Sequence, residues 1–136
     1  MANGTMGFHF QMDPNILRSL DDTQMKTARQ KAVQAAGMVW ADETKEIVRE
    51  DNHIDTGLFV NSIGYATTGG TVPATASDVV NEMTSERDTT TLKIGSSVIY
   101  AAPLEKKYNL MARGLDRAQA RMQQVADHQL KRGLGL

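Results

Sequence analysis

The residues best suited to acid–base or metal chemistry stand close together at His53 and Asp55, two positions apart. An imidazole and a carboxylate at that spacing can act as general base and acid, or as two metal ligands. Asn, Asp and His are also common in short turns, where their side chains bond the local backbone. A turn is therefore the favoured interpretation of this pair, and a metal-dependent hydrolase is the weakest alternative.

Other chemical signatures are lacking in the sequence. The chain has no cysteine and three histidines, which excludes disulfides, thiolate zinc sites and cysteine nucleophiles. Gly69-Gly70 lacks the Lys and Ser/Thr that follow in a phosphate-binding loop, and Ser96-Ser97 lacks the flanking pattern of a nucleophile elbow. We expect no catalytic residue, no cofactor and no metal, and interpret the two serines as hydrogen-bonding groups at a strand edge.

Composition indicates one soluble intracellular domain over residues 1–136. Fifteen Lys and Arg residues against sixteen Asp and Glu residues give a net charge of −1, without the basic excess typical of nucleic-acid or membrane binding. No apolar run is long enough to span a membrane, and the first twelve residues lack a signal-peptide pattern. We expect a product that is neither processed nor anchored.

The elements that must position any site begin with a strand over residues 7–12, where apolar and polar side chains alternate. A long helix is predicted to run to about Glu50, with Asp21, Asp22 and Thr23 as its N-cap candidates. One broad apolar face supports this helix, formed by Met25, Ala28, Ala32, Ala36, Val39, Trp40, Ile47 and Val48.

The middle of the chain predicts further strands. Residues 55–57 form a turn, and residues 58–67 have a strand-like composition with Phe59, Ile63 and Tyr65. Residues 67–91 are rich in Thr, Ser, Gly and Asp, and form either a long loop or a hairpin with arms near 77–87 and 90–97. Residues 91–100 predict a strand with a kink at Gly95.

A second amphipathic helix is predicted from about Tyr108, with Gly133 as its C-cap. Its apolar positions are Met111, Leu115, Ala118, Met122, Val125, Ala126 and Leu130. We therefore predict an α+β domain in which a small, mostly antiparallel sheet of about four strands packs with two long α-helices. The eight methionines are spread along the chain and are interpreted as adaptable core residues.

Charges are unevenly placed along both long helices. Basic residues stand near the start of the first helix and acidic residues crowd its end, where the helix dipole prefers cations. A solvated face is one interpretation, and the arginine stripe of the last helix would then be balanced by Asp116 and Asp127. The other is a charged contact between subunits of a head-to-tail ring. The candidate interface residues are Lys26, Arg29, Asp42, Glu46, Glu50, Arg113, Arg117 and Arg121.

Two separated stretches form a recognisable pattern when read together. The first is an Asp-Thr-Gly turn followed by a hydrophobic residue and a Ser-Ile pair, at Asp55, Thr56, Gly57, Leu58, Ser62 and Ile63. The second is a strand ending in Gly-Ser, then Tyr-Ala and a Glu, at Gly95, Ser96, Tyr100, Ala101 and Glu105. Over residues 20–132 this resembles the tail-completion (head-tail joining) family of long-tailed bacteriophages, named after the tenth gene product of a lambdoid siphophage.

The resemblance implies a structural virion protein at the head-tail interface of the tail, assembled in the host cytoplasm. It implies a ring of identical subunits, hexameric in the family, that contacts the neck or stopper protein and the tail terminator or tail tube proteins. DNA would pass through the ring without being read. In the motif, Asp55, Thr56 and Gly57 would reverse the chain, Tyr100 would bury its ring, and Glu105 would anchor the connection to the last helix.

Three alternatives to a tail-completion protein remain at this stage. A tail terminator or a head-side stopper protein stays within the virion. A small nucleic-acid-binding regulatory protein would use Arg113, Arg117 and Arg121 on duplex phosphates. The hydrolase around His53 and Asp55 is the third.

Overall fold

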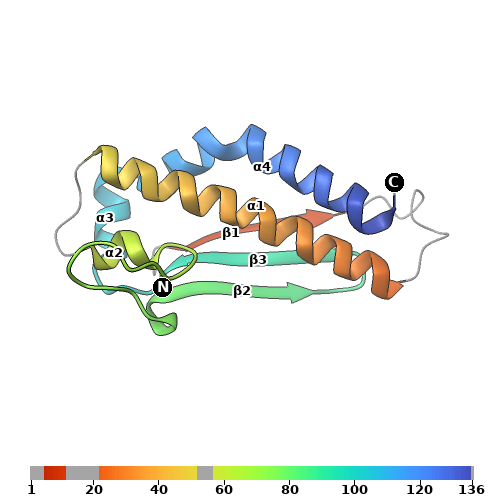
Figure 1. The fold of residues 1–136 in the computed structure, drawn as a ribbon, viewed down its shortest axis with the longest axis horizontal. Coiled ribbons are helices and arrows are strands. Elements are labelled where there is room, and N and C mark those ends of the chain that lie inside the picture. The colour runs from red at the N-terminus through yellow and green to blue at the C-terminus, as the bar shows by residue number, and fades with distance from the viewer. Residues whose placement is uncertain (1–4, 12–21, 52–56, 136) are drawn as a thin grey trace.

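The computed structural model of the chain describes residues 5–11, 22–51 and 57–135. The elements follow in the order β1 (Thr5–Gln11), α1 (Asp22–Glu50), α2 (Leu58–Ser62), the 3-10 helix η1 (Ala76–Asp78), β2 (Val79–Ser85), β3 (Thr89–Ser96), α3 (Ala101–Tyr108) and α4 (Leu110–Leu134) (Figure 1). The predicted α+β class is confirmed, with long helices packed on a small antiparallel sheet.

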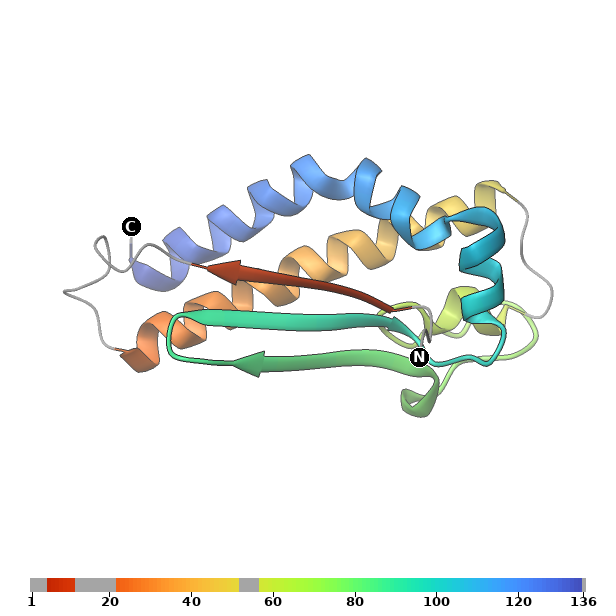
Figure 2. The same cartoon turned by 180° about the vertical axis from the view of Figure 1, so that it is seen from behind.

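The sheet is antiparallel with strand order β1-β3-β2, so β3 is central and the two other strands form its edges. Leu92 of β3 lies between Phe8 of β1 and Met83 of β2 in the register. Both long helices lie on the same side of the sheet, and its other face is seen uncovered in Figure 2. Glu82 and Lys93 are paired in the register and are exposed, as expected for strands with one solvated face.

The core forms where α1 and α4 meet the sheet. Trp40 is fully buried, and its indole Nε1–H donates a 3.0 Å hydrogen bond to the carbonyl oxygen of Met111. On β3, Leu92 and Ile94 are fully buried below the helices. The predicted apolar faces of both long helices are confirmed, because Trp40 and Ile47 of α1 and Met111 and Ala118 of α4 belong to this cluster. Ala28 of α1 packs with Leu134 in a second, smaller cluster.

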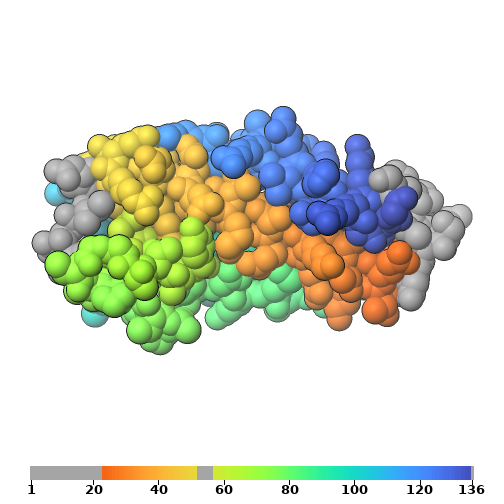
Figure 3. Space-filling view, in the orientation of Figure 1, coloured from red at the N-terminus to blue at the C-terminus, as the bar shows by residue number. Residues whose placement is uncertain are grey.

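Helices α1 and α4 run antiparallel along most of their length (Figures 1 and 3) and approach closely at two glycines. A Cβ atom on Gly114 would lie 1.9 Å from Thr44 Oγ1, and one on Gly133 would lie 3.1 Å from the Cβ of Ala28. The prediction of Gly133 as C-cap was wrong. The C-cap is Gly135, in the left-handed conformation with φ 72°, and Gly133 is inside α4, where the packing of Ala28 leaves little room for a side chain.

The strand predicted over residues 58–67 is wrong, and the described residues hold three strands rather than about four. Leu58–Ser62 is the short helix α2, closed by a 2.9 Å bond from the amide of Asn61 to the carbonyl oxygen of Gly57. Residues Phe59, Val60, Asn61 and Ser62 are all buried. With neighbouring residues buried on every side, the stretch has no exposed face, and its β-prone composition was misleading.

The hairpin alternative for residues 67–91 is confirmed, since β2 and β3 pair directly and the amide of Glu86 bonds the carbonyl oxygen of Thr89 across the turn at 2.7 Å. The strand predicted to extend to residue 100 ends at Ser96, and Gly95 is paired on both sides without a break. The missed helix α3 begins at Ala101. Its Pro103 lies in the first turn, where a backbone N–H would have no acceptor inside the helix, so the missing N–H of proline costs nothing there.

Candidate functional site

The two halves of the sequence motif lie against each other beneath α1. Ser62 Oγ and Ser96 Oγ are 2.6 Å apart and both residues are fully buried. Ser62 Oγ also donates to the carbonyl oxygen of Phe59 (2.7 Å), so Ser96 supplies the shared proton, and Ser96 Oγ accepts from the amide of Val98 (3.2 Å). This chain of bonds ties the end of β3 to α2, and confirms a hydrogen-bonding role for Ser96.

The first half of the motif enters α2 through Gly57, whose φ is 94°. A Cβ atom there would lie 2.9 Å from the carbonyl oxygen of Gly69, so the position needs glycine for its conformation and for space. Ile63 is fully buried one residue after α2. Asp55 and Thr56 lie outside the described residues, as does the His53–Asp55 pair considered for catalysis.

The second half of the motif differs from expectation at Tyr100. Ala101 is fully buried, whereas Tyr100 is 38% exposed. The Tyr100 ring contacts the Phe59 ring on one side in a tilted arrangement, with a centroid distance of 6.3 Å. The expected burial of the Tyr100 ring is therefore wrong. Tyr100 precedes α3 rather than lying in a strand, so its side chain is not held between sheet neighbours.

Glu105 connects α3 to α4. Its Oε1 accepts from the amide of Met111 at 2.6 Å and its Oε2 from the amide of Ala112 at 3.2 Å. These are two of the first amides of α4, which have no partner inside the helix. The chain turns between the helices at Asn109, with φ 53°. The expectation that Glu105 anchors the last helix is confirmed, and its role is that of a charged cap.

Replacing Glu105 with alanine should lower the free energy of unfolding by about 1–2 kcal/mol, because two amides lose their acceptor and the helix N-terminus loses an anion. Chemical denaturation followed by circular dichroism measures this. Glu105→Gln keeps one acceptor oxygen and should fall between the parent and Glu105→Ala. Equal stability of all three proteins would show that the cap is not needed.

The charged ends of the long helices pair within the chain. The Arg113 guanidinium reaches Asp51 at 2.5 Å, and Arg117 contacts Glu50 at 2.7 Å and Glu43 at 2.8 Å. Hydrogen bonding from Arg117 lowers the pKa of Glu50, and the pKa values of both arginines are raised by their carboxylate partners. The acidic end of α1 is thus compensated by α4 of the same subunit, which accounts for its position against the helix dipole.

The other candidate interface residues are divided between the interior and the surface. Arg29 is only 1% exposed, so it is not an interface residue in this structure. Its guanidinium donates to Thr90 Oγ1 (3.3 Å) and to the carbonyl oxygens of Glu86 and Arg87 (both 3.2 Å). The remaining candidates are exposed, namely Lys26, Asp42, Glu46 and Arg121; of these, Glu46 pairs with Arg49 at 3.5 Å.

A buried lysine was missed by the sequence analysis. Lys45 is 1% exposed, and its Nζ donates to the carbonyl oxygen of Tyr65 at 2.8 Å. The ammonium lies 3.5 Å from the centroid of the Tyr65 ring, and the Tyr65 hydroxyl donates to Asp42. Burial lowers the pKa of Lys45 to about 8, and the bond to Asp42 raises the pKa of Tyr65 to about 12. Lys45 follows Thr44 on the buried side of α1, which was the available signal.

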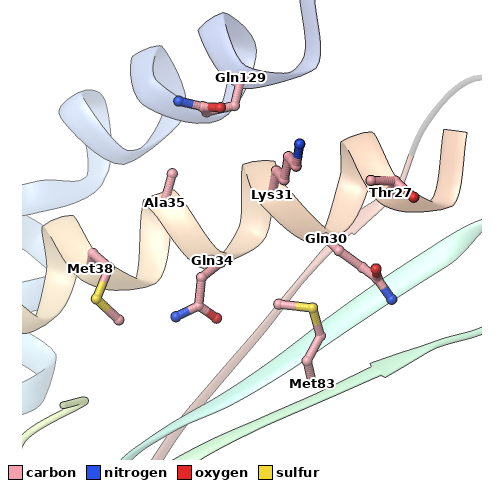
Figure 4. A pocket seen from close by; sticks show the side chains of 8 residues that line it. All are labelled: Thr27, Gln30, Lys31, Gln34, Ala35, Met38, Met83 and Gln129. Atoms are coloured by element: carbon pink, nitrogen blue, oxygen red, sulfur yellow. The ribbon is translucent and has the colours of Figure 1, made fainter. Parts of the chain in front are cut away.

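A shallow groove of about 500 Å³ runs over α1 between β2 and α4. Figure 4 shows Gln34 and Met38 on the side of α1 toward β2, from which Met83 rises, and Lys31 and Ala35 on the side toward α4. The remaining lining residues are Thr27, Gln30 and Gln129. The lining combines amides and thioethers with one cation, a set that offers surface for contact and no acid–base pair.

Three large apolar side chains are conspicuously exposed in the described part of the chain: Val72 at 36%, Tyr100 at 38% and Ile99 at 92%. Val72 belongs to the segment between α2 and η1, and the other two to the link between β3 and α3. Both segments lie at the end of the molecule where α1 ends (Figure 1). An apolar side chain as exposed as that of Ile99 is a candidate for contact with another protein.

Over the described ranges 5–11, 22–51 and 57–135, no group of three metal-ligating side chains comes together, and none of the helices there is long and apolar enough to cross a membrane. Comparison of the chain with protein-family models, with curated proteins and with solved structures gave no match. The resemblance to the tail-completion family therefore rests on the motif residues and on the order of the elements.

Proposed function

We propose that this protein is a structural virion protein, a tail-completion or head-tail joining subunit that forms a ring between the tail tube and the neck of a long-tailed phage. The ring is a homohexamer, as the resemblance implies, and DNA passes through it without sequence recognition. Its role is assembly, so it uses neither a cofactor nor a catalytic residue.

The observation that carries the proposal is the contact between the two halves of the motif. Ser62 and Ser96 are far apart in sequence, yet their buried hydroxyl groups share a hydrogen bond. The amide of Gly64 also donates to the carbonyl oxygen of Gly95 at 3.0 Å. A chance likeness between two short stretches would not require them to form one bonded unit, so this contact supports the use of both as a single family signature.

The exposed apolar end supports an assembly role. Ile99 has almost its whole side chain in solvent, and such exposure stabilises nothing within the subunit. We assign Val72, Ile99 and Tyr100 to the contact with the neighbouring ring or with the next copy.

Replacing Ile99 with aspartate should abolish or strongly weaken binding to phage particles without lowering the stability of the subunit. Thr84→Asp is the matched control, because it adds the same charge at an exposed position of β2, in the sheet whose outer face is uncovered. Binding is measured by co-sedimentation with isolated tails and isolated heads, and stability by thermal unfolding. Undiminished binding by Ile99→Asp would remove this end of the molecule from the interface.

The same co-sedimentation separates the candidate functions. A tail-completion or terminator protein binds the head-proximal end of isolated tails, whereas a stopper protein binds isolated heads. Salt-dependent binding to duplex DNA would favour the regulatory alternative. That alternative is weakened by the ion pairs of Arg113 and Arg117, which engage two of its three arginines with carboxylates of α1.

A further inference from the structure

The segment of residues 64–74, here called the strap, links α2 toward η1 and lies against α1. Residues 68–73 of the strap are exposed, and Ala74 is its one buried hydrophobic side chain. The side-chain amide of Asn61, in α2, donates hydrogen bonds to the carbonyl oxygens of Gly69 and Val72 in the strap. Tyr65, at the start of the strap, packs against the core, but residues 68–73 are held mainly by polar bonds and bury little apolar surface, so this part has a low free energy of local opening.

Asp42 and Lys45 of α1 both fasten the strap with charged groups: Asp42 accepts from the Tyr65 hydroxyl, and Lys45 is the buried one of the two. Its Nζ donates to the Tyr65 carbonyl oxygen at 2.8 Å and to Thr67 Oγ1 at 3.4 Å. Both acceptors are neutral, and the nearby Asp42 carboxylate is bonded to the Tyr65 hydroxyl. The closed strap thus covers an ammonium group without a directly bonded anion, an arrangement that is unfavourable relative to a hydrated ammonium.

We propose that the charge on Lys45 controls the opening of the strap. The strap opens to hydrate the buried ammonium group, and it closes more tightly when Lys45 loses its proton. The inference concerns motion within the subunit and holds whether or not the protein belongs to a phage tail.

The direction of the pH dependence follows from linkage. Burial lowers the pKa of Lys45 in the closed state to about 8, against an ordinary value of 10.5 that it regains when hydrated. The open state therefore binds the proton more tightly, and opening is easiest below about pH 8. Between these two values closure gains stability as the pH rises.

Three ionisable groups near Lys45 modify the pH range over which closure of the strap gains stability. On α1, Asp42 raises the pKa of Lys45 and Arg49 lowers it. On the strap, the pKa of Tyr65 is raised from 10.0 to about 12, so closure loses stability again as the pH passes above 10. The strap should be most tightly closed near pH 10.

Opening would alter the apolar end of the molecule. Val72 is carried by the strap, and its carbonyl oxygen accepts one of the two bonds from Asn61. Near neutral pH, the strap is therefore free to adjust Val72 to a partner that binds the same end through Ile99 and Tyr100.

Hydrogen exchange at two strap amides tests the proposal in the full chain. The amide of Thr67 donates to the Asn61 carbonyl oxygen and that of Ala74 to the Thr67 carbonyl oxygen, so both report opening. Their protection factors, corrected for intrinsic exchange, should rise roughly twentyfold between pH 7.5 and pH 9.5. Lys45→Met should show higher protection at pH 7.5 and no dependence on pH in this range.

A second variant leaves Lys45 in place. Arg49→Gln removes a nearby cation from an exposed position, so it should raise protection a few-fold at pH 7.5 and leave it unchanged at pH 9.5. Lys31→Gln, on an exposed part of α1 that does not contact the strap, should match the parent at both pH values. Protection independent of pH in the parent, or lower protection in Lys45→Met, would overturn the proposal.

Discussion

Replacing Gly114 with alanine should destabilise the protein by about 2 kcal/mol, although the same change in an exposed helix interior stabilises by up to about 1 kcal/mol. The added Cβ would lie 1.9 Å from Thr44 Oγ1 and 3.2 Å from its Cα. Helices α1 and α4 would have to separate where the start of α4 packs on the C-terminal part of α1. Urea denaturation, followed by the fluorescence of the only tryptophan, Trp40, measures the loss.

Thr44 supplies the matched control for Gly114. Its buried hydroxyl finds no hydrogen-bond partner among the described residues, so Thr44→Ala alone should be neutral or slightly stabilising. Combining Thr44→Ala with Gly114→Ala should recover part of the lost stability, because the closest contact is removed. Close packing here would be disproved by a Gly114→Ala protein as stable as the parent.

Replacing Arg29 with alanine should cost about 2–3 kcal/mol of unfolding free energy, since a buried side chain and three hydrogen bonds are lost together. Two of those bonds hold the carbonyl oxygens of Glu86 and Arg87 at the turn between β2 and β3. The amide of Glu86, which closes this turn, should lose hydrogen-exchange protection. Thermal unfolding and hydrogen exchange provide the two readouts.

Lys26→Ala is the matched control for Arg29→Ala, because Lys26 is an exposed cation one turn earlier on α1. It should change stability by less than about 0.5 kcal/mol. The sequence-based hypothesis placed both residues in a subunit interface. An Arg29→Ala protein with unchanged stability and impaired assembly would favour that hypothesis over the buried role found in the structure.

The long helices could be predicted from the sequence because periodic burial on one face is a strong local signal. Trp40, Ile47 and Val48 repeat at helical spacing on α1, and Met111, Ala118 and Met122 do so on α4. The β2–β3 hairpin was one of two interpretations, since its strands contain many threonines and serines on both faces. The pairing of the two strands, which runs from Val79 with Ser96 to Ser85 with Thr90, decides between loop and hairpin, and no single residue type signals it in the sequence.

Helix α2 and the ion pairs between the two long helices could not be predicted, for a different reason. The α2 residues Phe59 and Val60 are typical of strands, and their helical turn depends on the left-handed Gly57 and on burial by distant segments. Glu50 and Arg117 meet only because α4 returns antiparallel along α1. The sequence shows an acidic end of α1 that needs cationic partners, and the fold supplies them from α4 of the same subunit.

Of the candidate site, the positions of Ser96 and Glu105 were anticipated best. Each makes a bond within its own stretch of chain, Ser96 with the amide of Val98 and Glu105 with the amide of Met111. The bond between Ser96 and Ser62 is long-range and could not be read from the sequence. Lys45 was missed because a lysine side chain is normally exposed, and the strap that buries this one lies 20 residues further along the chain.

The central claim is that this chain forms a ring at the head-tail junction, and imaging the neck of the virion by electron cryomicroscopy tests it most directly. The account predicts a ring of copies around the DNA channel, each fitted by two antiparallel helices on a three-stranded sheet, with the Ile99 end in contact with a neighbouring protein. A neck fully explained by other chains, with this protein absent from purified particles, would contradict the account.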